Sequence, residues 1–196
     1  GFNKWSRVLD FGREGNAFMV QNHKTSSSVI FEIRDRDGGK HQIQKSGKAK
    51  KGKWHHIAVV SGYDGMKFYI DGDQVGSDSY TGSLADVAGG KNYIGKSNWP
   101  NDKLFHGHMH EFRIWNRPRT QDEIRQGIYS HLTGTETGLI GCWRFDLAVG
   151  DRVPDLSSMG RDAVLMGTAA ISTAEGPPIG QRPPEVVSVS SPPPVP

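Results

Sequence analysis

The sequence predicts an all-β protein, a two-sheet antiparallel β-sandwich with one short helix. Short stretches in which apolar and polar residues alternate recur along the chain, with the period of a strand that buries one face. Glycine is abundant, at 25 of 196 residues, as expected where many strands are joined by tight turns. Hydrophobic residues make up 35% of the chain, which suits two layers that each keep one face in water.

The predicted strands follow one another along the chain. Their ranges are 7–11, 17–21, 29–34, 41–44, 54–60, 67–70, 73–76, 92–95, 104–115, 139–146 and 162–167. The Asp71-Gly72 pair between two of them is a strong hairpin signal, because both turn positions need positive φ. Thr120 is the expected N-cap of a helix over 121–126, with Glu123 three residues on as in a capping box.

We expect one domain over residues 1–175, in which 138–175 completes the sheets. The proline-rich stretch 176–196 is expected to be a linker or tail that leads to a further domain or anchor. Cys142 is the single cysteine, so no intrachain disulfide forms. The cysteine count therefore does not indicate whether the protein works in an oxidising or a reducing compartment. No apolar run approaches the ~18–20 residues of a membrane span, so no membrane insertion is expected.

Five motifs occur in one order and together resemble the bacterial-type laminin-G-like, concanavalin A-like lectin/glucanase domains. They are W-S-R-V-L-D-F-G at 5–12, G-K-W-H-H-I-A-V at 52–59, F-Y-I-D-G at 68–72, Y-I-G-K-S at 93–97 and F-H-G-H-M-H-E-F-R-I-W-N-R at 105–117. The stretch G-L-I-G-C-W-R-F-D at 138–146 resembles a pattern that stands beside such sandwiches. The strands that usually precede the first motif are absent, so this stretch either fills their place, which we expect, or begins a second repeat.

The resemblance implies a concanavalin A-like jelly roll, and calcium is the ion that such domains usually bind at one rim. Asp10 and Asn16 are the candidate ligands, near the first hairpin. The closely spaced acids that would define a calcium site are not present in the sequence. Calcium is therefore the one candidate cofactor, and no other is expected.

A basic cluster is the clearest feature beyond the fold. No acidic residue occurs from position 38 to position 63, and the cluster within this stretch consists of Lys45, Lys48, Lys50, Lys51 and Lys53. Such a positive field attracts a polyanionic polysaccharide. The alternative is that the lysines only solubilise a loop beside an edge strand. Aromatic residues are not interleaved with them as base stacking requires, so nucleic acid is not an expected partner.

The segment 97–102 carries a second candidate contact, Trp99 flanked by Asn98 and Asn101. A loop tryptophan stacks on sugar rings, and amides bond their hydroxyls. It can equally pin its own loop to the sandwich, and the sequence leaves both open.

His106, His108 and His110 alternate and would share one face of a regular strand. Surface histidines are the preferred interpretation, with a metal site as the alternative.

Catalysis has little support in the sequence. Glycosidases need two carboxylates on either side of the scissile bond, and no such pair is visible. A nucleophile elbow and a phosphate loop are also missing. We therefore expect a non-catalytic extracellular or cell-surface module for adhesion or binding, with polysaccharide, matrix or glycoprotein as partner. The alternatives are a structural domain that packs against neighbouring domains of a large surface or assembly protein, and an accessory domain of a secreted hydrolase.

Overall fold

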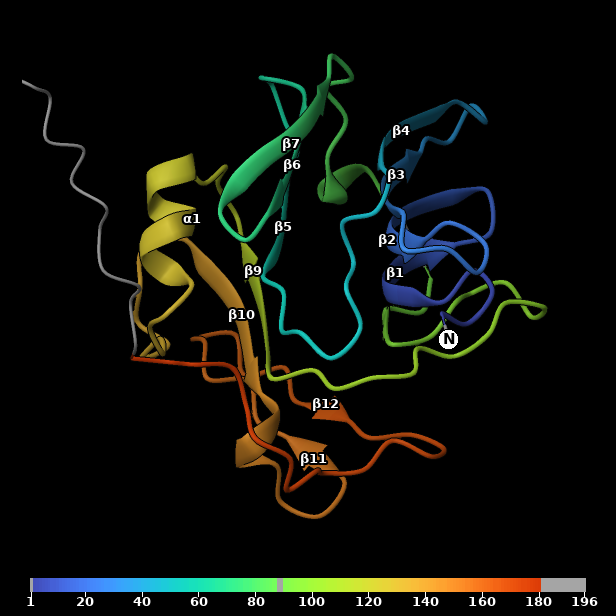
Figure 1. Cartoon of the computed structure of the whole chain (residues 1–196). Coiled ribbons are helices and arrows are strands. Elements are labelled where there is room, and N and C mark those ends of the chain that lie inside the picture. The colour runs from blue at the N-terminus through green and yellow to red at the C-terminus, as the bar shows by residue number, and fades with distance from the viewer. Residues whose placement is uncertain (1, 88–89, 181–196) are drawn as a thin grey trace, which may run out of the picture.

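Antiparallel sheets face each other across one core in the computed structural model, which describes residues 2–87 and 90–180 (Figure 1). The first sheet has five strands in the order β4-β3-β2-β1-β8. Their bounds are β1 Arg7–Arg13, β2 Asn16–Asn22, β3 Val29–Arg34, β4 Lys40–Lys45 and β8 Tyr93–Ile94. This arrangement confirms the predicted all-β antiparallel sandwich.

The second layer contains a three-stranded sheet, in the order β5-β6-β7, and the two-stranded ribbon β9-β10. Their bounds are β5 Ile57–Val60, β6 Met66–Ile70, β7 Asp73–Asp78, β9 Glu111–Trp115 and β10 Leu139–Arg144. Two 3₁₀ turns, η1 Leu84–Asp86 and η2 Phe145–Leu147, and a small ribbon of β11 Arg152–Val153 and β12 Ala163–Val164 complete the described elements.

The core follows from the alternation of side chains along each strand. Phe18 and Val20 of β2 and Phe31 of β3 point inward, and Phe31 is fully buried. The Phe31 ring lies 5.0 Å from Phe18 in its own sheet and 6.2 Å from Phe68 in the opposite sheet, measured between centroids. Aromatic contacts thus join the two layers at their centre.

The two local motifs have the predicted geometry. Asp71 and Gly72 have φ of 54° and 84°, as a two-residue hairpin turn requires, and they join β6 to β7. The hydroxyl of Thr120 accepts from the Glu123 amide, and the Glu123 carboxylate accepts from the Thr120 amide. This capping box starts α1 Gln121–Gly127, one residue longer than predicted.

The helix docks on the hairpin turn. Gln121 and Arg125 both donate to the carbonyl of Gly72. A Cβ at position 72 would lie 2.8 Å from the Cγ of Arg125, so glycine is required here by the packing as well as by the turn.

The segment after residue 137 contributes to the second layer through β10, which pairs antiparallel with β9. The strand predicted over 162–167 is wrong in length, since only Ala163–Val164 is extended, and it pairs with β11 in a separate two-stranded ribbon. The reason is Asp155, whose carboxylate accepts from the amides of Cys142, Ser157 and Arg161. This turn folds the chain back, so that β12 returns beside β11.

Two further predictions need correction. The strand predicted over 104–115 begins only at Glu111, because the chain before it crosses from the first sheet to β9, between the main sheets and the ribbon β11-β12 (Figure 1). The strand predicted over 54–60 begins at Ile57. Of the segment predicted as a linker, 176–196, residues 181–196 lie outside the described residues. Among the described residues, none of the helices has the length and apolar character to cross a membrane.

Removal of β10 tests its place in the fold. We expect a chain that ends at residue 137 to lose cooperative thermal unfolding, because β9 would lose its partner strand and buried groups such as Leu139 and Cys142 would be missing. A chain that ends at residue 180 should melt like the full chain. A cooperative melt at an unchanged temperature for the 1–137 chain would contradict this expectation.

Candidate binding surfaces

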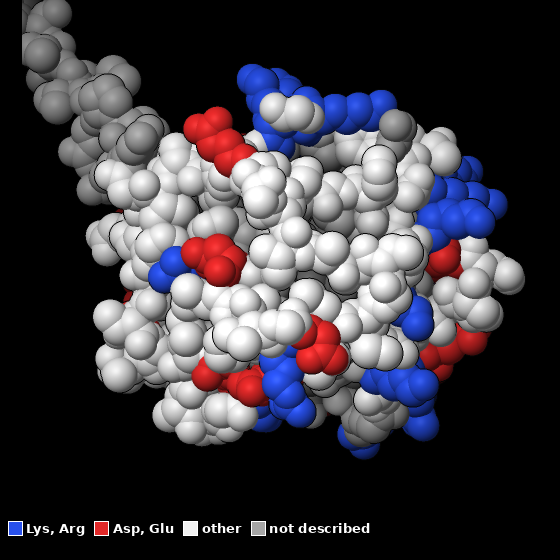
Figure 2. Space-filling model, turned by 90° about the horizontal axis from the view of Figure 1, so that it is seen from below, with Lys and Arg blue, Asp and Glu red and all other residues white. Residues whose placement is uncertain are grey.

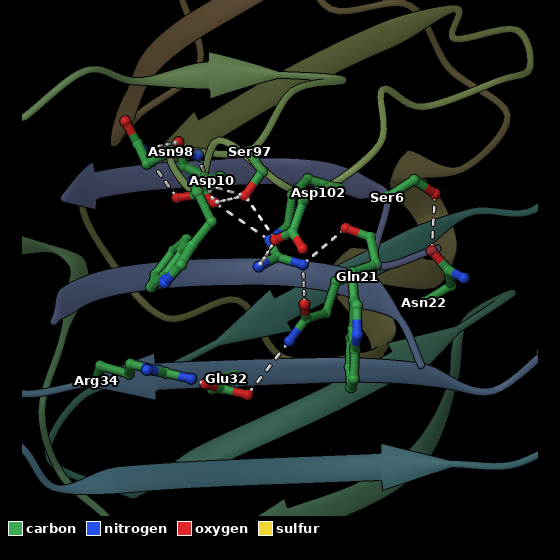
Figure 3. Close-up of polar contacts among 12 residues, drawn as sticks. Ser6, Asp10, Gln21, Asn22, Glu32, Arg34, Ser97, Asn98 and Asp102 are labelled. Atoms are coloured by element: carbon green, nitrogen blue, oxygen red, sulfur yellow. Dashed lines mark hydrogen bonds and ion pairs between the residues drawn. The ribbon is translucent and has the colours of Figure 1, made fainter. Parts of the chain in front are cut away.

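A buried ion pair lies on the face of the five-stranded sheet that points away from the core (Figure 3). Asp10 of β1 is 0% exposed, and its carboxylate accepts from Arg7 Nε at 3.2 Å and from Ser97 Oγ at 3.2 Å. The backbone amide of Asn98 donates to the same carboxylate at 3.1 Å and its side-chain amide at 2.9 Å. Burial of a carboxylate is tolerable only with such compensation.

The network extends from this pair across the sheet. Arg7 also donates to Asp102 at 2.8 Å and to the amide oxygen of Gln21 on β2. Gln21 donates to Glu32 on β3, which is 1% exposed and pairs with Arg34. Polar residues therefore occupy the outer positions of three adjacent strands, alternating with the core residues.

The segment 97–102 covers this network, and Trp99 lies over it. The Trp99 ring centroid is 5.4 Å from the Arg7 guanidinium and 5.2 Å from that of Arg34, within the range of cation–π contact. Trp99 is half-buried. The side-chain amide of Asn98 donates to the Asp10 carboxylate and to the Lys91 carbonyl. Asn101 is exposed. The geometry matches the loop-pinning role for Trp99, and sugar contact by these three residues stays a prediction.

The candidate calcium ligands do not form a pair. Asp10 is engaged by the donors just described, with which a cation would have to compete. Asn16 lies at the start of β2, opposite Arg13, and donates to the Arg34 carbonyl at 3.1 Å. In the described part of the chain, no group of three or more His, Cys, Asp or Glu side chains is arranged to hold a metal ion. Calcium binding stays a prediction.

The lysine cluster consists of Lys45, the last residue of β4, and of Lys48, Lys50, Lys51 and Lys53 in the connection from β4 to β5. All its lysines are exposed except Lys45, which is half-buried. Within the described residues, none of the five ammonium groups has a carboxylate within 4.0 Å, while Lys40 and Lys67 do. Seen from below, the molecule has basic side chains mainly at the upper, right-hand and lower margins of a face whose middle is largely uncharged (Figure 2). The cluster is thus a set of cations without internal counterions.

The backbone of this connection is nevertheless held in place. The Ala49 amide donates to the Ser27 carbonyl, in the turn between β2 and β3, at 3.0 Å. The Lys50 amide donates to Nε2 of His55 at 3.1 Å, and Nδ1 of His55 lies 2.9 Å from the Asp71 carboxylate. The lysine side chains are therefore presented from a loop that is fixed at two points.

Histidines gather near the start of β9. The Trp54 ring lies 6.5 Å from both His108 and His110, and His110 stacks on His131 at 5.7 Å. His56 is adjacent, its Nδ1 is buried without a hydrogen-bond partner, and burial together with the charge of Arg113 lowers its pKa to about 4. Residues 106–110 are not in a strand, so the three histidines predicted on one strand face are not aligned in that way.

Near these histidines, the Glu111 carboxylate is ion-paired and the Cys142 thiol is buried. The carboxylate of Glu111 pairs with Arg113 and faces His131. Burial raises the pKa of Cys142 to about 11, and this side chain is 0% exposed. Sequence reasoning did not anticipate that Asp10, Arg7, Gln21 and Glu32 form one network, although a polar residue recurs at outward strand positions.

Comparison with known proteins agrees with this architecture. A family model described as "Concanavalin A-like lectin/glucanases superfamily", of the laminin-G type, matches residues 1–125. A protein of Bacteroides ovatus proposed to bind carbohydrate has a similar crystal structure, with a TM-score of 0.63 at 17% identity. That match covers 88% of this chain and 52% of the other, so the chain spans about half the length of this relative.

An S-layer domain-containing protein of Clostridium thermocellum, residues 221–444, matches with a TM-score of 0.35 and 25% identity over 63% of this chain and 62% of the other. No curated protein matches the chain.

Loss of the Asp10 carboxylate tests the buried network. We expect Asp10→Ala to lower the free energy of unfolding by about 3 kcal/mol, because Arg7 would stay buried without one of its partners. Denaturant unfolding measures the change. Asp37→Ala, at an exposed acid, is the matched control and should change stability by less than about 0.5 kcal/mol. Equal stability of the two variants would contradict a structural role for the pair.

His56 predicts a pH dependence of stability. Its native pKa of about 4 lies below the ordinary 6.5, so the unfolded chain binds a proton that the native chain excludes between these values. The free energy of unfolding therefore falls as pH drops from about 6.5 toward 4. We expect the denaturation midpoint to be lower at pH 5 than at pH 7, and His56→Gln to reduce this difference. His106→Gln, at an exposed site, should leave it unchanged; equal behaviour of both variants would refute the assignment.

Proposed function

Because the chain belongs to the concanavalin A-like lectin/glucanase superfamily, we propose that it is a non-catalytic module that binds polyanionic polysaccharide through its lysine cluster. The observation that carries the proposal is a cluster of five lysines within nine residues. Four of these lysines are exposed, and among the described residues none of the five has a carboxylate within 4.0 Å. The superfamily includes glucanases as well as lectins, so membership alone leaves the activity open.

The physical argument is electrostatic. The cluster places five positive charges within nine residues, and in the described structure no neighbouring acid neutralises them. Each ammonium group can therefore exchange its small counterions for sulfate or carboxylate groups of a polymer. The loop that carries the lysines is fixed at Ser27 and at His55, which reduces the entropy lost on binding.

Several observations support binding rather than catalysis. Glu111, the acid of the histidine-rich region, is paired with Arg113. Asp10 and Glu32, which are buried acids of the five-stranded sheet, are held by Arg7 and Arg34. Carboxylates neutralised by guanidinium groups are poor general acids. The similar protein of Bacteroides ovatus, which is proposed to bind carbohydrate, adds a fold-level analogy. An extracellular or cell-surface location, where such polymers occur, is part of the proposal.

Retention on immobilised heparin tests the lysine cluster. We expect the chain to be retained and to elute as salt rises, because charge contacts are screened over a Debye length of ~8 Å at physiological ionic strength. The triple variant Lys48→Ser, Lys50→Ser, Lys51→Ser should lose retention with an unchanged melting temperature, since exposed charges contribute little to stability.

The matched control is the triple variant Lys48→Arg, Lys50→Arg, Lys51→Arg, which preserves charge and should stay on the column. Undiminished retention of the serine variant would place polyanion binding elsewhere. Failure of the unaltered chain to bind heparin at low salt would refute the proposal and favour the view that the lysines only solubilise the loop.

A further inference from the structure

A second basic site lies at the opposite end of the five-stranded sheet. It is an open cleft of about 430 Å³ between the turn that joins β1 to β2 and the segment around β8. Ala49, which lies between lysines of the cluster, contacts Ser27 beyond the other end of β2. The length of a seven-residue strand, roughly 20 Å, therefore separates the two regions. A small ligand cannot reach both.

Three cations line the cleft, Arg13, Lys91 and Lys96. All three are exposed, and within the described residues none has a carboxylate within 4.0 Å. The Lys96 ammonium lies 4.5 Å from the centroid of the Tyr93 ring, which also lines the cleft. The charge is therefore placed beside an aromatic surface, within the range of a cation–π contact.

The floor of the cleft is backbone. Gly12 has φ of 111°, a conformation that favours glycine, and Gly90 lies directly against it. A Cβ at position 90 would stand 1.5 Å from the Gly12 carbonyl oxygen, so side chains are excluded from this contact. The two bare peptide segments leave room for a ligand above them.

The buried network holds the walls in place. The Asn98 amide donates to the Lys91 carbonyl at 3.0 Å and to the Asp10 carboxylate at 2.9 Å. Lys91 is thereby tied to β1, and Lys96 precedes Ser97, which is bonded to the same carboxylate. The cations are attached to a preorganised frame rather than to a free loop.

We propose that this cleft binds a single sugar unit bearing a carboxylate, at a site separate from the lysine cluster. The cations attract the carboxylate, and the Tyr93 ring, with Lys96 over one face, adds apolar surface to the wall of the cleft for a pyranose. Glu14, at the rim, accepts from hydroxyls and repels a second negative charge, which favours a uronic acid over a phosphate dianion. The cleft volume falls within the range of small-ligand sites.

Titration of the full chain with trigalacturonate, followed by NMR, tests the proposal. We expect saturable shifts at the amides of Gly12 and Lys96 and at the Tyr93 ring. The methyl-esterified trisaccharide, which lacks the charge, should shift these signals at least tenfold more weakly. The triple variant Arg13→Ser, Lys91→Ser, Lys96→Ser should bind trigalacturonate at least tenfold more weakly, with an unchanged melting temperature.

The lysine-cluster serine variant is the control, and its signals at Gly12, Lys96 and Tyr93 should saturate at the same trigalacturonate concentration as those of the unaltered chain, because these signals report on the cleft alone. This arm separates the two proposals, because loss of heparin retention and loss of trigalacturonate binding would arise from different variants. Equal binding of the acid and its ester would refute the proposal. Shifts with inorganic phosphate that exceed those with trigalacturonate would also overturn it.

Discussion

The outer face of the five-stranded sheet depends on the buried pairing of Arg7 with Asp10. The carboxylate has no exposed surface, and its cost of desolvation is offset by a guanidinium, a hydroxyl and two amide donors. Since three of these four donors come from Ser97 and Asn98, the pair also determines where the covering segment lies. Asn98 bonds the Lys91 carbonyl and precedes Trp99, so the position of Asn98 also determines where Lys91 and Trp99 lie. One ion pair thus positions a loop more than eighty residues away in sequence.

The fold could be predicted from the sequence because its signals are local. Alternation defines the strands, Asp71-Gly72 defines a turn by its φ values, and Thr120 with Glu123 defines a helix start. The failures have a common cause. Contacts between distant segments determine that residues 104–110 are not a strand and that residues 163–164 pair with β11. The bonds of Asp155 to the amides of Cys142 and Arg161 are an example. Periodicity carries no information about such contacts.

The candidate sites divide in the same way. The lysine cluster is visible in the sequence because its five residues lie within nine positions, and the structure adds only the exposure of four of them and the absence of acids nearby in the described residues. The cleft is invisible in the sequence because Arg13 and Lys91 are brought together by pairing of β1 with β8. Trp99 shows a third case, in which the residue type suggests a ligand contact and its position over two guanidinium groups gives it a structural role.

The contact between the lysine loop and His55 has a chemical consequence. The Lys50 amide donates to Nε2, which fixes that nitrogen as an acceptor, so neutral His55 carries its proton on Nδ1 toward Asp71. Through Asp71-Gly72 the same chain of contacts continues to Arg125 of α1. The imidazole is thereby held from both sides, so the position of the lysine loop is coupled to the β6–β7 turn on which α1 docks.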